Sequence, residues 1–204
     1  MNGLIRSLKL LILISALWSG ISQAQMTCEE VFRTSTEPVL RLADFNIRHA
    51  SKVDVTGIIR FVRGIREQLG VDPDFTADHR PMYKDLANIK ETYDTERGDF
   101  FVLRNDAGEI VGTGGYLSVR KNVCELKKIY LDPSTRGKGT GGAFLKWIIA
   151  QVTQKGFSKI ILQTDPAMAS AIELYKKIGF VQIKKVTPGS SAIYFALDVE
   201  SRKL

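Results

Sequence analysis

The sequence predicts an α/β (α+β) domain, in which helices flank a central β-sheet, and three observations lead to this class. From Asp44 onward, short apolar runs typical of strands alternate with longer segments whose apolar residues recur at helical spacing. Two of the strands are joined by a turn that contains Asp and Gly, which is a hairpin signal. A later strand leads through a glycine-rich loop directly into an amphipathic helix.

The expected elements follow one another along the chain from this point. Residues 45–49 predict a short strand, and Asp54 is a good N-cap for a helix whose apolar residues run to Leu69. A polar loop is expected at residues 71–81, followed by a weaker helix at 83–93. The later expected elements are the hairpin strands 100–104 and 110–119, the strand 125–131, the helix 141–155, the strand 160–164, the helix 168–178, and the closing strands 180–184 and 191–199.

The strand at residues 125–131 carries an irregularity. Leu126 and Ile129 are both apolar, but their odd spacing would place them on opposite faces of a regular strand. A strand with one buried face keeps a single parity unless an inserted residue shifts it. We therefore expect a β-bulge in this strand.

The loop that follows this strand has the composition of a phosphate-binding site. A helix start presents unpaired N–H groups and the positive end of a dipole, which together bind phosphate. Gly137, Gly139 and Gly141 let the backbone approach a ligand closely, and Arg136 and Lys138 add positive charge beside those amides. The loop is therefore expected to bind a pyrophosphate.

Two better-known nucleotide motifs do not describe this loop. A Walker loop is absent, and the dinucleotide fingerprint, although matched by three glycines, lacks an acidic residue about 20 positions further on in the required context. The alternative of a merely flexible glycine-rich turn stays open. It leaves the neighbouring Arg136 and the strongly amphipathic helix without an explanation.

The motif Arg136-x-x-Gly139-x-Gly141 resembles the Arg/Gln-x-x-Gly-x-Gly/Ala signature of the GNAT acetyltransferase superfamily. The preceding strand, residues 125–133, is typical of that superfamily, and so is the downstream segment 171–180. The resemblance covers about residues 45–199 and is strongest over 125–180. This combination of motifs is more specific than either motif alone.

The resemblance implies a GNAT fold, with a mixed central sheet that splays between the fourth and fifth strands, here 125–131 and 160–164. Acetyl-CoA would be the co-substrate, without a metal, and its acetyl-pantetheine arm would lie in the splay. A bulge fits this picture, because these folds use one to open the sheet. The cofactor-binding residues that the resemblance implies are Ile129, Tyr130, Leu131, Arg136, Gly137, Lys138, Gly139, Thr140 and Gly141.

The implied activity is direct transfer of an acetyl group to a primary amine of a small molecule or peptide. Tyr175 resembles the family's acid for the CoA thiolate, and the alternative is a tyrosine packed in the core. Glu125 is the candidate general base, because a buried carboxylate there would have a raised pKa. The alternative is a solvent-facing glutamate or one paired with Lys127 or Lys128.

The sequence departs from the family pattern at two positions. Gln163 stands where some members have a catalytic glutamate, and Met168 stands where many have an asparagine that contacts CoA. A non-catalytic domain that binds CoA or a protein partner therefore remains the second hypothesis. Acidic residues in the loop 71–81 would attract a cationic amine, unless the loop is an ordinary polar connection.

The charge and composition of the chain limit the classes of partner and ligand that we expect. The formal net charge is +7, but no basic run with interleaved aromatic residues appears, so no specific nucleic-acid partner is expected. Cys28 and Cys124 lack the spacing of a zinc site. They form a disulfide in one reading and are free thiols, with Cys124 buried in a strand, in the other. Dimers are common in the resembled family, so a homodimer is also an expectation.

Residues 1–24 resemble a signal peptide, with basic residues first, an apolar run at 10–21, and the small residues Ser22 and Ala24 before a cleavage site. The expected location is then periplasmic or secreted, with no stable membrane span after cleavage. An uncleaved anchor, or translation from Met26, would leave the domain in the cytoplasm, where acetyl-CoA is made. The expected division is 1–24, an extension at 25–43, and an N-acetyltransferase domain at 44–200.

Overall fold

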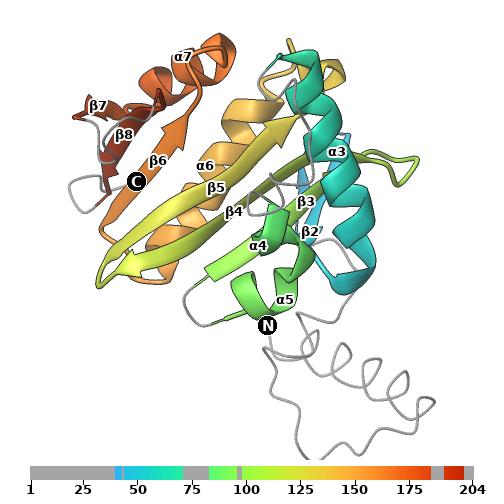
Figure 1. Ribbon diagram of the computed structural model, residues 1–204, viewed down its shortest axis with the longest axis horizontal. Helices are drawn as coiled ribbons and strands as arrows, with labels where there is room; N and C mark the ends of the chain where they lie inside the picture. Colours follow the sequence, from blue (N-terminus) through green and yellow to red (C-terminus); the bar gives the residue numbers. More distant parts are fainter. Residues whose placement is uncertain (1–39, 43, 71–82, 96–97, 185–190, 200–204) are drawn as a thin grey trace, which may run out of the picture. The chain divides into compact units, whose positions relative to one another are not determined.

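The computed structural model describes residues 40–42, 44–70, 83–95, 98–184 and 191–199 (Figure 1). The expected signal peptide, Cys28 and the acidic loop 71–81 lie outside these residues. Within the described part of the chain, none of the helices is long and apolar enough to cross a membrane.

The described residues form a mixed sheet with the strand order β1-β2-β3-β4-β5-β6-β8-β7. Only β5 and β6 are parallel neighbours, and the other neighbouring pairs are antiparallel. Counted from β2, these two are the fourth and fifth strands of the predicted sheet. The strands are β1 (Leu40–Leu42), β2 (Phe45–His49), β3 (Gly98–Arg104), β4 (Ile110–Arg120), β5 (Val123–Leu131), β6 (Lys159–Thr164), β7 (Val181–Ile183) and β8 (Ile193–Asp198).

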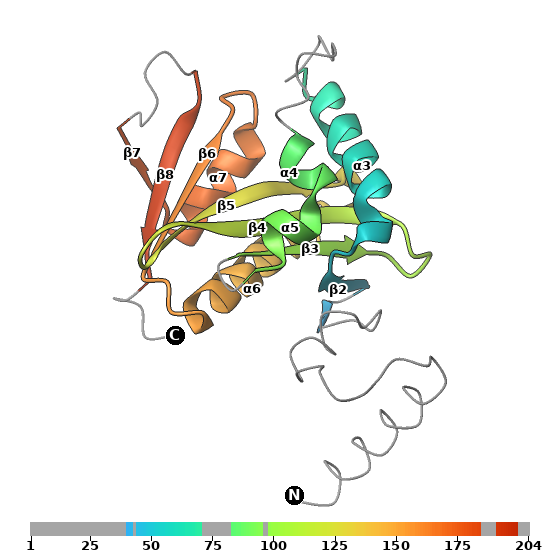
Figure 2. The same cartoon turned by 60° about the horizontal axis from the view of Figure 1, so that its bottom comes forward.

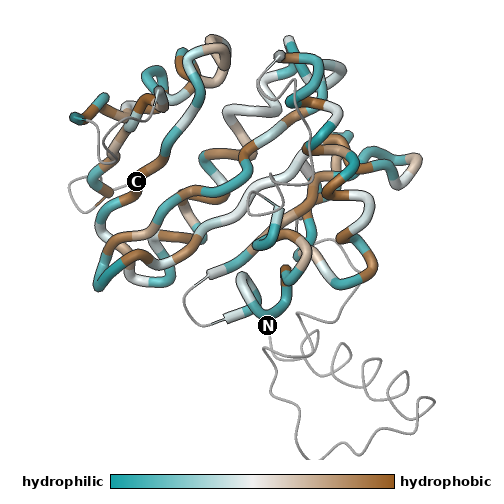
Figure 3. Tube along the Cα trace, in the orientation of Figure 1, coloured by the Kyte–Doolittle hydropathy of each residue, from teal (hydrophilic) through white to brown (hydrophobic). Residues whose placement is uncertain are grey.

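Helices cover both faces of the sheet (Figures 1 and 2). On one face lie α3 (Val55–Gln68), α4 (Lys84–Ala87) and α5 (Ile89–Tyr93), and on the other lie α6 (Thr140–Gln154) and α7 (Ala169–Ile178). The helix expected at residues 83–93 is thus two short helices, because Asn88 between them has a non-helical ψ of 48°. Apolar residues recur along the strands and helices (Figure 3), and they form one buried core on each face of the sheet.

The sheet opens between β5 and β6, as the resemblance implies. The two strands pair only at Val123 with Lys159, Cys124 with Ile160, and Glu125 with Ile161. Beyond Glu125 the strands diverge, which Figure 1 shows as a widening separation toward the end of β5. The second half of β5 therefore has a strand neighbour on its β4 side only.

The predicted bulge is present in β5. Two residues of this strand, Lys128 and Ile129, lie opposite the single residue Gly114 of β4. Lys128 adopts a φ of 53°, in the left-handed region. The extra residue brings Leu126 and Ile129 to the same core, on the α6 side. A Cβ on Gly114 would come within 2.8 Å of side-chain carbons of Ile129 and Ile148, so the close approach here requires glycine.

Asp54 joins β2, β3 and the start of α3. Its carboxylate is 1% exposed, and Oδ1 lies 2.6 Å from both Arg48 and Arg104. Oδ2 accepts hydrogen bonds from the Ser51 amide at 2.8 Å and the Ser51 hydroxyl at 2.7 Å. Asp54 does precede α3, as predicted, but its side chain makes no capping hydrogen bond, because Ser51 and the arginines occupy both oxygens. Burial alone would raise its pKa, but the hydrogen bonds and the Arg48 charge outweigh burial and lower the pKa below the usual 3.8.

Replacing Asp54 by Asn is expected to lower the free energy of unfolding at pH 7 by about 3 kcal/mol, because two part-buried guanidinium groups lose a buried counter-charge. The folded-state pKa is the lower one, so this stabilisation is complete above about pH 4 and is lost as the pH falls through the folded-state pKa. Urea denaturation at pH 7 and pH 3 measures both effects. The matched control, Asp106→Asn, removes an exposed pair with Arg41 and should cost less than about 0.5 kcal/mol. Equal losses in the two variants would contradict the role assigned to Asp54.

Candidate functional site: a cavity in the splayed sheet

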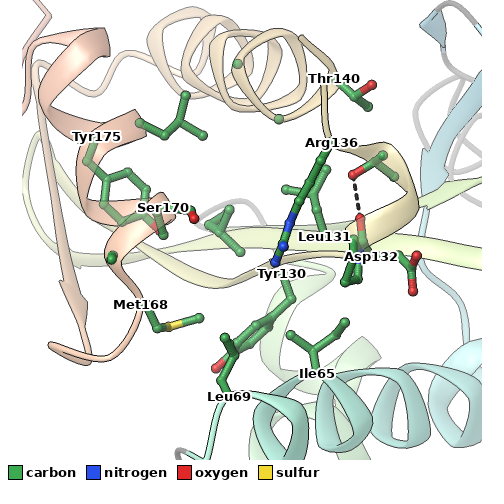
Figure 4. A pocket seen from close by; sticks show the side chains of 18 of the residues that line it. Ile65, Leu69, Tyr130, Leu131, Asp132, Arg136, Thr140, Met168, Ser170 and Tyr175 are labelled. Carbon is green, nitrogen blue, oxygen red and sulfur yellow. Dashed lines mark hydrogen bonds between the residues drawn. The ribbon is translucent and has the colours of Figure 1, made fainter. Parts of the chain in front are cut away.

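A cavity of about 690 Å³ lies where β5 and β6 diverge (Figure 4). Its walls are the end of β5, the loop before α6 with the first turn of that helix, the first two turns of α7 and the end of α3. The structure brings most of the sequence-predicted site residues together here. Those that line the cavity are Ile129, Tyr130, Leu131, Arg136, Gly137, Gly139, Thr140, Gly141 and Tyr175.

The loop before α6 presents open backbone to the cavity. It begins with the short 3₁₀-helix η3 (Pro133–Thr135), where the Asp132 carboxylate accepts from the Ser134 amide at 2.8 Å. Gly137 and Gly139 then adopt φ values of 74° and 71°, and a Cβ on either residue would meet nothing within 4 Å. These two positions combine a backbone conformation that favours glycine with free space in front of the peptide.

The amides of this loop are free to bind an anion. Backbone hydrogen bonds stop at the amide of Arg136, which donates to Pro133, and resume at the amide of Ala143, which donates to Gly139. Among the described residues, the amides from 137 to 142 have no acceptor. They include the first N–H groups of α6, where the helix dipole is positive. A pyrophosphate of the kind the sequence predicts fits this set of donors.

The two cations of the loop have different surroundings. Arg136 lines the cavity, and Figure 4 shows its side chain extending from the loop toward Tyr130. Lys138 does not line this cavity: its ammonium lies 3.8 Å from the Asp44 carboxylate and 5.7 Å from the Phe45 ring centroid. Of the described residues that line the cavity, Arg136 is thus the one with a positive side chain, while Arg66, outside the lining, donates to the Tyr130 hydroxyl at 2.9 Å.

The second half of β5 offers a free strand edge to the same cavity. The Asp132 amide donates to Val111 at 2.9 Å, so in this antiparallel pair the main-chain groups of every second residue point to β4. Ile129 and Leu131 have the opposite parity, and their N–H and C=O groups point to the edge that β6 has left. An extended ligand with amide groups can pair there as an added strand does.

Tyr175 is both a core residue and a cavity residue. The residue is 5% exposed, and its ring packs against Phe180 and Phe195 with centroid distances of 5.8 and 6.0 Å. Among the described residues, no group hydrogen-bonds to its hydroxyl. Burial, with a smaller contribution from Tyr130, raises the pKa of Tyr175 above its usual value. The phenol is therefore protonated at neutral pH and its O–H is available to a ligand.

Glu125 lies outside the cavity lining. Its carboxylate is 2.7 Å from the ammonium of Lys127, and the Glu125 side chain is 17% exposed. The ion pair with a neighbouring lysine, one of the two alternatives drawn from the sequence, is therefore present. Its role as a base stays a prediction.

The end of α3 forms a further wall of the cavity, although none of its residues is among the cofactor-binding residues that the resemblance implies. Ile65 and Gln68 of α3, and Leu69 at its C-cap, line the cavity together with Tyr130 and Met168, and Figure 4 shows Ile65 and Leu69 at the end of this helix. The helical periodicity places Ile65 and Leu69 on the apolar face of the predicted helix. It does not predict whether that face contacts another element of the fold or a cavity. Met168 does line the cavity, in the region where many GNAT proteins carry an asparagine.

No metal centre is formed by the described side chains: no group of three or more His, Cys, Asp or Glu is placed to share an ion. Cys124 is fully buried in β5 as a free thiol, and burial raises its pKa to about 12. Its thiol is therefore protonated and enclosed in the core.

Comparison with known proteins shows the family of this chain. Residues 65–180 match the family described as "Acetyltransferase (GNAT) family". The chain belongs to this family. The uncharacterized N-acetyltransferase YjgM of Escherichia coli K12 is 30% identical over 142 residues, which cover 67% of this chain and 82% of that protein.

Solved GNAT structures share the fold. An acetyltransferase of the GNAT family from Staphylococcus aureus Mu50 superposes with a TM-score of 0.68 at 25% identity, over 76% of this chain and 98% of that one. A GNAT superfamily phosphinothricin acetyltransferase from Sinorhizobium meliloti, solved in complex with AcCoA, gives a TM-score of 0.59 at 22% identity, over 76% and 89% of the two chains. The splayed mixed sheet is therefore the GNAT fold.

The glycine loop is tested by Gly139→Asp, which adds bulk and a negative charge in front of the open amides. We expect acetyl-CoA to bind at least about 100-fold more weakly, measured by isothermal titration calorimetry. Gly108→Asp is the matched control, because Gly108 also has a positive φ and open space but lies in the β3–β4 turn. Retained affinity in Gly139→Asp would refute the assignment of the loop.

Proposed function

We propose that this protein is an acetyl-CoA-dependent N-acetyltransferase that moves an acetyl group directly to a primary amine of a small molecule or peptide. The observation that carries the proposal is the cavity itself. It joins a cluster of unpaired amides at a helix start to a free strand edge, and Tyr175 lies on the opposite wall. A long ligand with a pyrophosphate at one end and amides along its arm fits this combination.

Each part of the cavity then has a task. The loop amides and Arg136 hold the pyrophosphate, and the edge groups of Ile129 and Leu131 pair with the amides of the arm. Acetyl-CoA supplies an activated acetyl group as a thioester. When the amine nitrogen has bonded to the carbonyl carbon and the carbon–sulfur bond breaks, the Tyr175 hydroxyl donates its proton to the departing thiolate.

The attacking amine must also lose a proton. Gln163 cannot accept one, so we assign this step to Glu125 or to a water molecule. Glu125 lies at the point where β5 leaves β6, next to the open edge. In the unliganded protein its carboxylate pairs with Lys127 at 2.7 Å, so an acceptor ammonium would compete with that lysine for the same oxygens.

A second candidate function follows from the same ion pair. If Lys127 keeps the carboxylate engaged, the cavity binds CoA without transferring its acetyl group, and the domain acts as a CoA-binding or partner-binding module. Calorimetry with acetyl-CoA, followed by a panel of amino acids, polyamines and peptides, separates the two. Binding together with CoA thiol release and an acetylated product by mass spectrometry supports the enzyme. Binding without release from any amine supports the module, and absence of binding contradicts both.

Tyr175→Phe tests the proton donor. We expect turnover to fall about 100-fold, while the dissociation constant of acetyl-CoA changes less than about twofold, because the hydroxyl acts only as the thiolate leaves. Tyr116→Phe is the control, since Tyr116 is 1% exposed in the same core but does not line the cavity. Unchanged turnover in Tyr175→Phe would remove this residue from the mechanism.

A further inference from the structure

The bulge residue Lys128 lies at the boundary between the closed and the open part of the sheet. Upstream of it, β5 pairs with β6 as far as Glu125. Directly downstream, Ile129, Tyr130 and Leu131 line the cavity. The conformation of Lys128 therefore sets the direction in which the free edge of β5 runs.

The main chain of Lys128 is held by a side chain of β4. The Thr113 hydroxyl donates a hydrogen bond to the Lys128 carbonyl at 2.9 Å, and Thr113 is fully buried. Lys128 adopts a φ of 53°, which is costly for a residue with a Cβ and persists where the surroundings hold it in place. The Thr113 hydrogen bond is one such restraint.

The side chain of Lys128 is held by an ion pair with α4. Its ammonium lies 3.5 Å from the Asp85 carboxylate on α4, and the Lys128 side chain is 17% exposed. Asp85 is itself fixed by the Tyr93 hydroxyl at 2.7 Å and by the Leu86 amide at 3.0 Å. Lys128 is thus tied to β4 through its carbonyl and to α4 through its ammonium.

We propose that Thr113 and Asp85 are positioning residues for the cofactor arm. By fixing Lys128 at the bulge, they orient the main-chain N–H and C=O groups of Ile129 and Leu131 toward the amides of the arm. Neither residue lines the cavity, so both act through the bulge. The inference rests on the proposed function, because it takes acetyl-CoA as the ligand of the open edge.

A comparison of two ligands separates positioning of the arm from general damage. Acetyl-CoA carries the arm, whereas 3′-phosphoadenosine 5′-diphosphate carries the pyrophosphate and has no arm. In Thr113→Val, which removes the hydroxyl at nearly constant volume, we expect acetyl-CoA to bind about tenfold more weakly by calorimetry. The affinity for the armless nucleotide should stay within about twofold of the wild type, because the loop before α6 is untouched.

Three further variants complete the test. Thr113→Ser keeps the hydroxyl and should keep the wild-type affinity for acetyl-CoA. Thr153→Val is the matched control, since Thr153 makes a similar bond to the Ile149 carbonyl at 2.8 Å within α6, away from the cavity. Asp85→Asn loosens the second, more exposed anchor, and we expect a selective loss of about threefold for acetyl-CoA. This variant carries the test if Thr113→Val does not fold, which a thermal melt shows.

Each outcome bears on the proposal. A loss for acetyl-CoA alone, rescued by Ser, supports it. Equal losses for both ligands, or no loss in Thr113→Val and Asp85→Asn, overturn it while leaving the proposed function intact. If the wild-type protein binds no acetyl-CoA, the proposed function fails and this inference fails with it.

Discussion

The limited pairing between β5 and β6 is the constraint on which the site depends. In the described part of the chain, only three residue pairs join these two strands, and they are also the one parallel contact of its sheet. A sheet with full pairing here would satisfy the main-chain groups of Ile129 and Leu131 and would leave no cavity. Because the two halves of the sheet are held together by three pairs and by the core on the α6 side, the strands separate without exposing that core.

Most of the groups that can bind an anion in the cavity belong to the main chain and not to side chains. Among the described residues that line it, Arg136 supplies a full positive charge, and the other donors are amides of the loop and of the first turn of α6. Amides in a fixed loop need no rearrangement to receive an anion, whereas long cationic side chains lose rotamer freedom when they bind. The glycines matter here because a side chain at either left-handed position would be strained and would stand in front of the donors.

Much of this arrangement could be predicted from local pattern. The bulge was predicted from the odd spacing of Leu126 and Ile129, and it does bring both residues to the core on the α6 side, although helices cover both faces of the sheet. The ends of α6 and α7 also followed from local signals, since a glycine with positive φ stands just beyond each helix.

Features that depend on distant partners could not be predicted in this way. Asp54 is a residue type that favours the N-cap of a helix. Its carboxylate instead forms ion pairs with two arginines, one from β2 and one from β3, and does not cap the helix start. Lys138 belongs to the glycine loop in sequence, yet a carboxylate and a ring near β2 hold it outside the cavity. Strand β1, which precedes Asp44, has only three residues, too few for a periodic signal, and it exists through its pairing with β2.

The Asp54 cluster has a geometric consequence for the cavity. It fixes the first turn of α3, while Ile65 and Leu69 at the far end of the same helix form a cavity wall. A helix of 14 residues is about 21 Å long, so a tilt of about 3° about the fixed end would displace the far end by about 1 Å. With its first turn held by the ion cluster, a small change in the angle of this helix would therefore change the width of the opening without a local rearrangement of the wall.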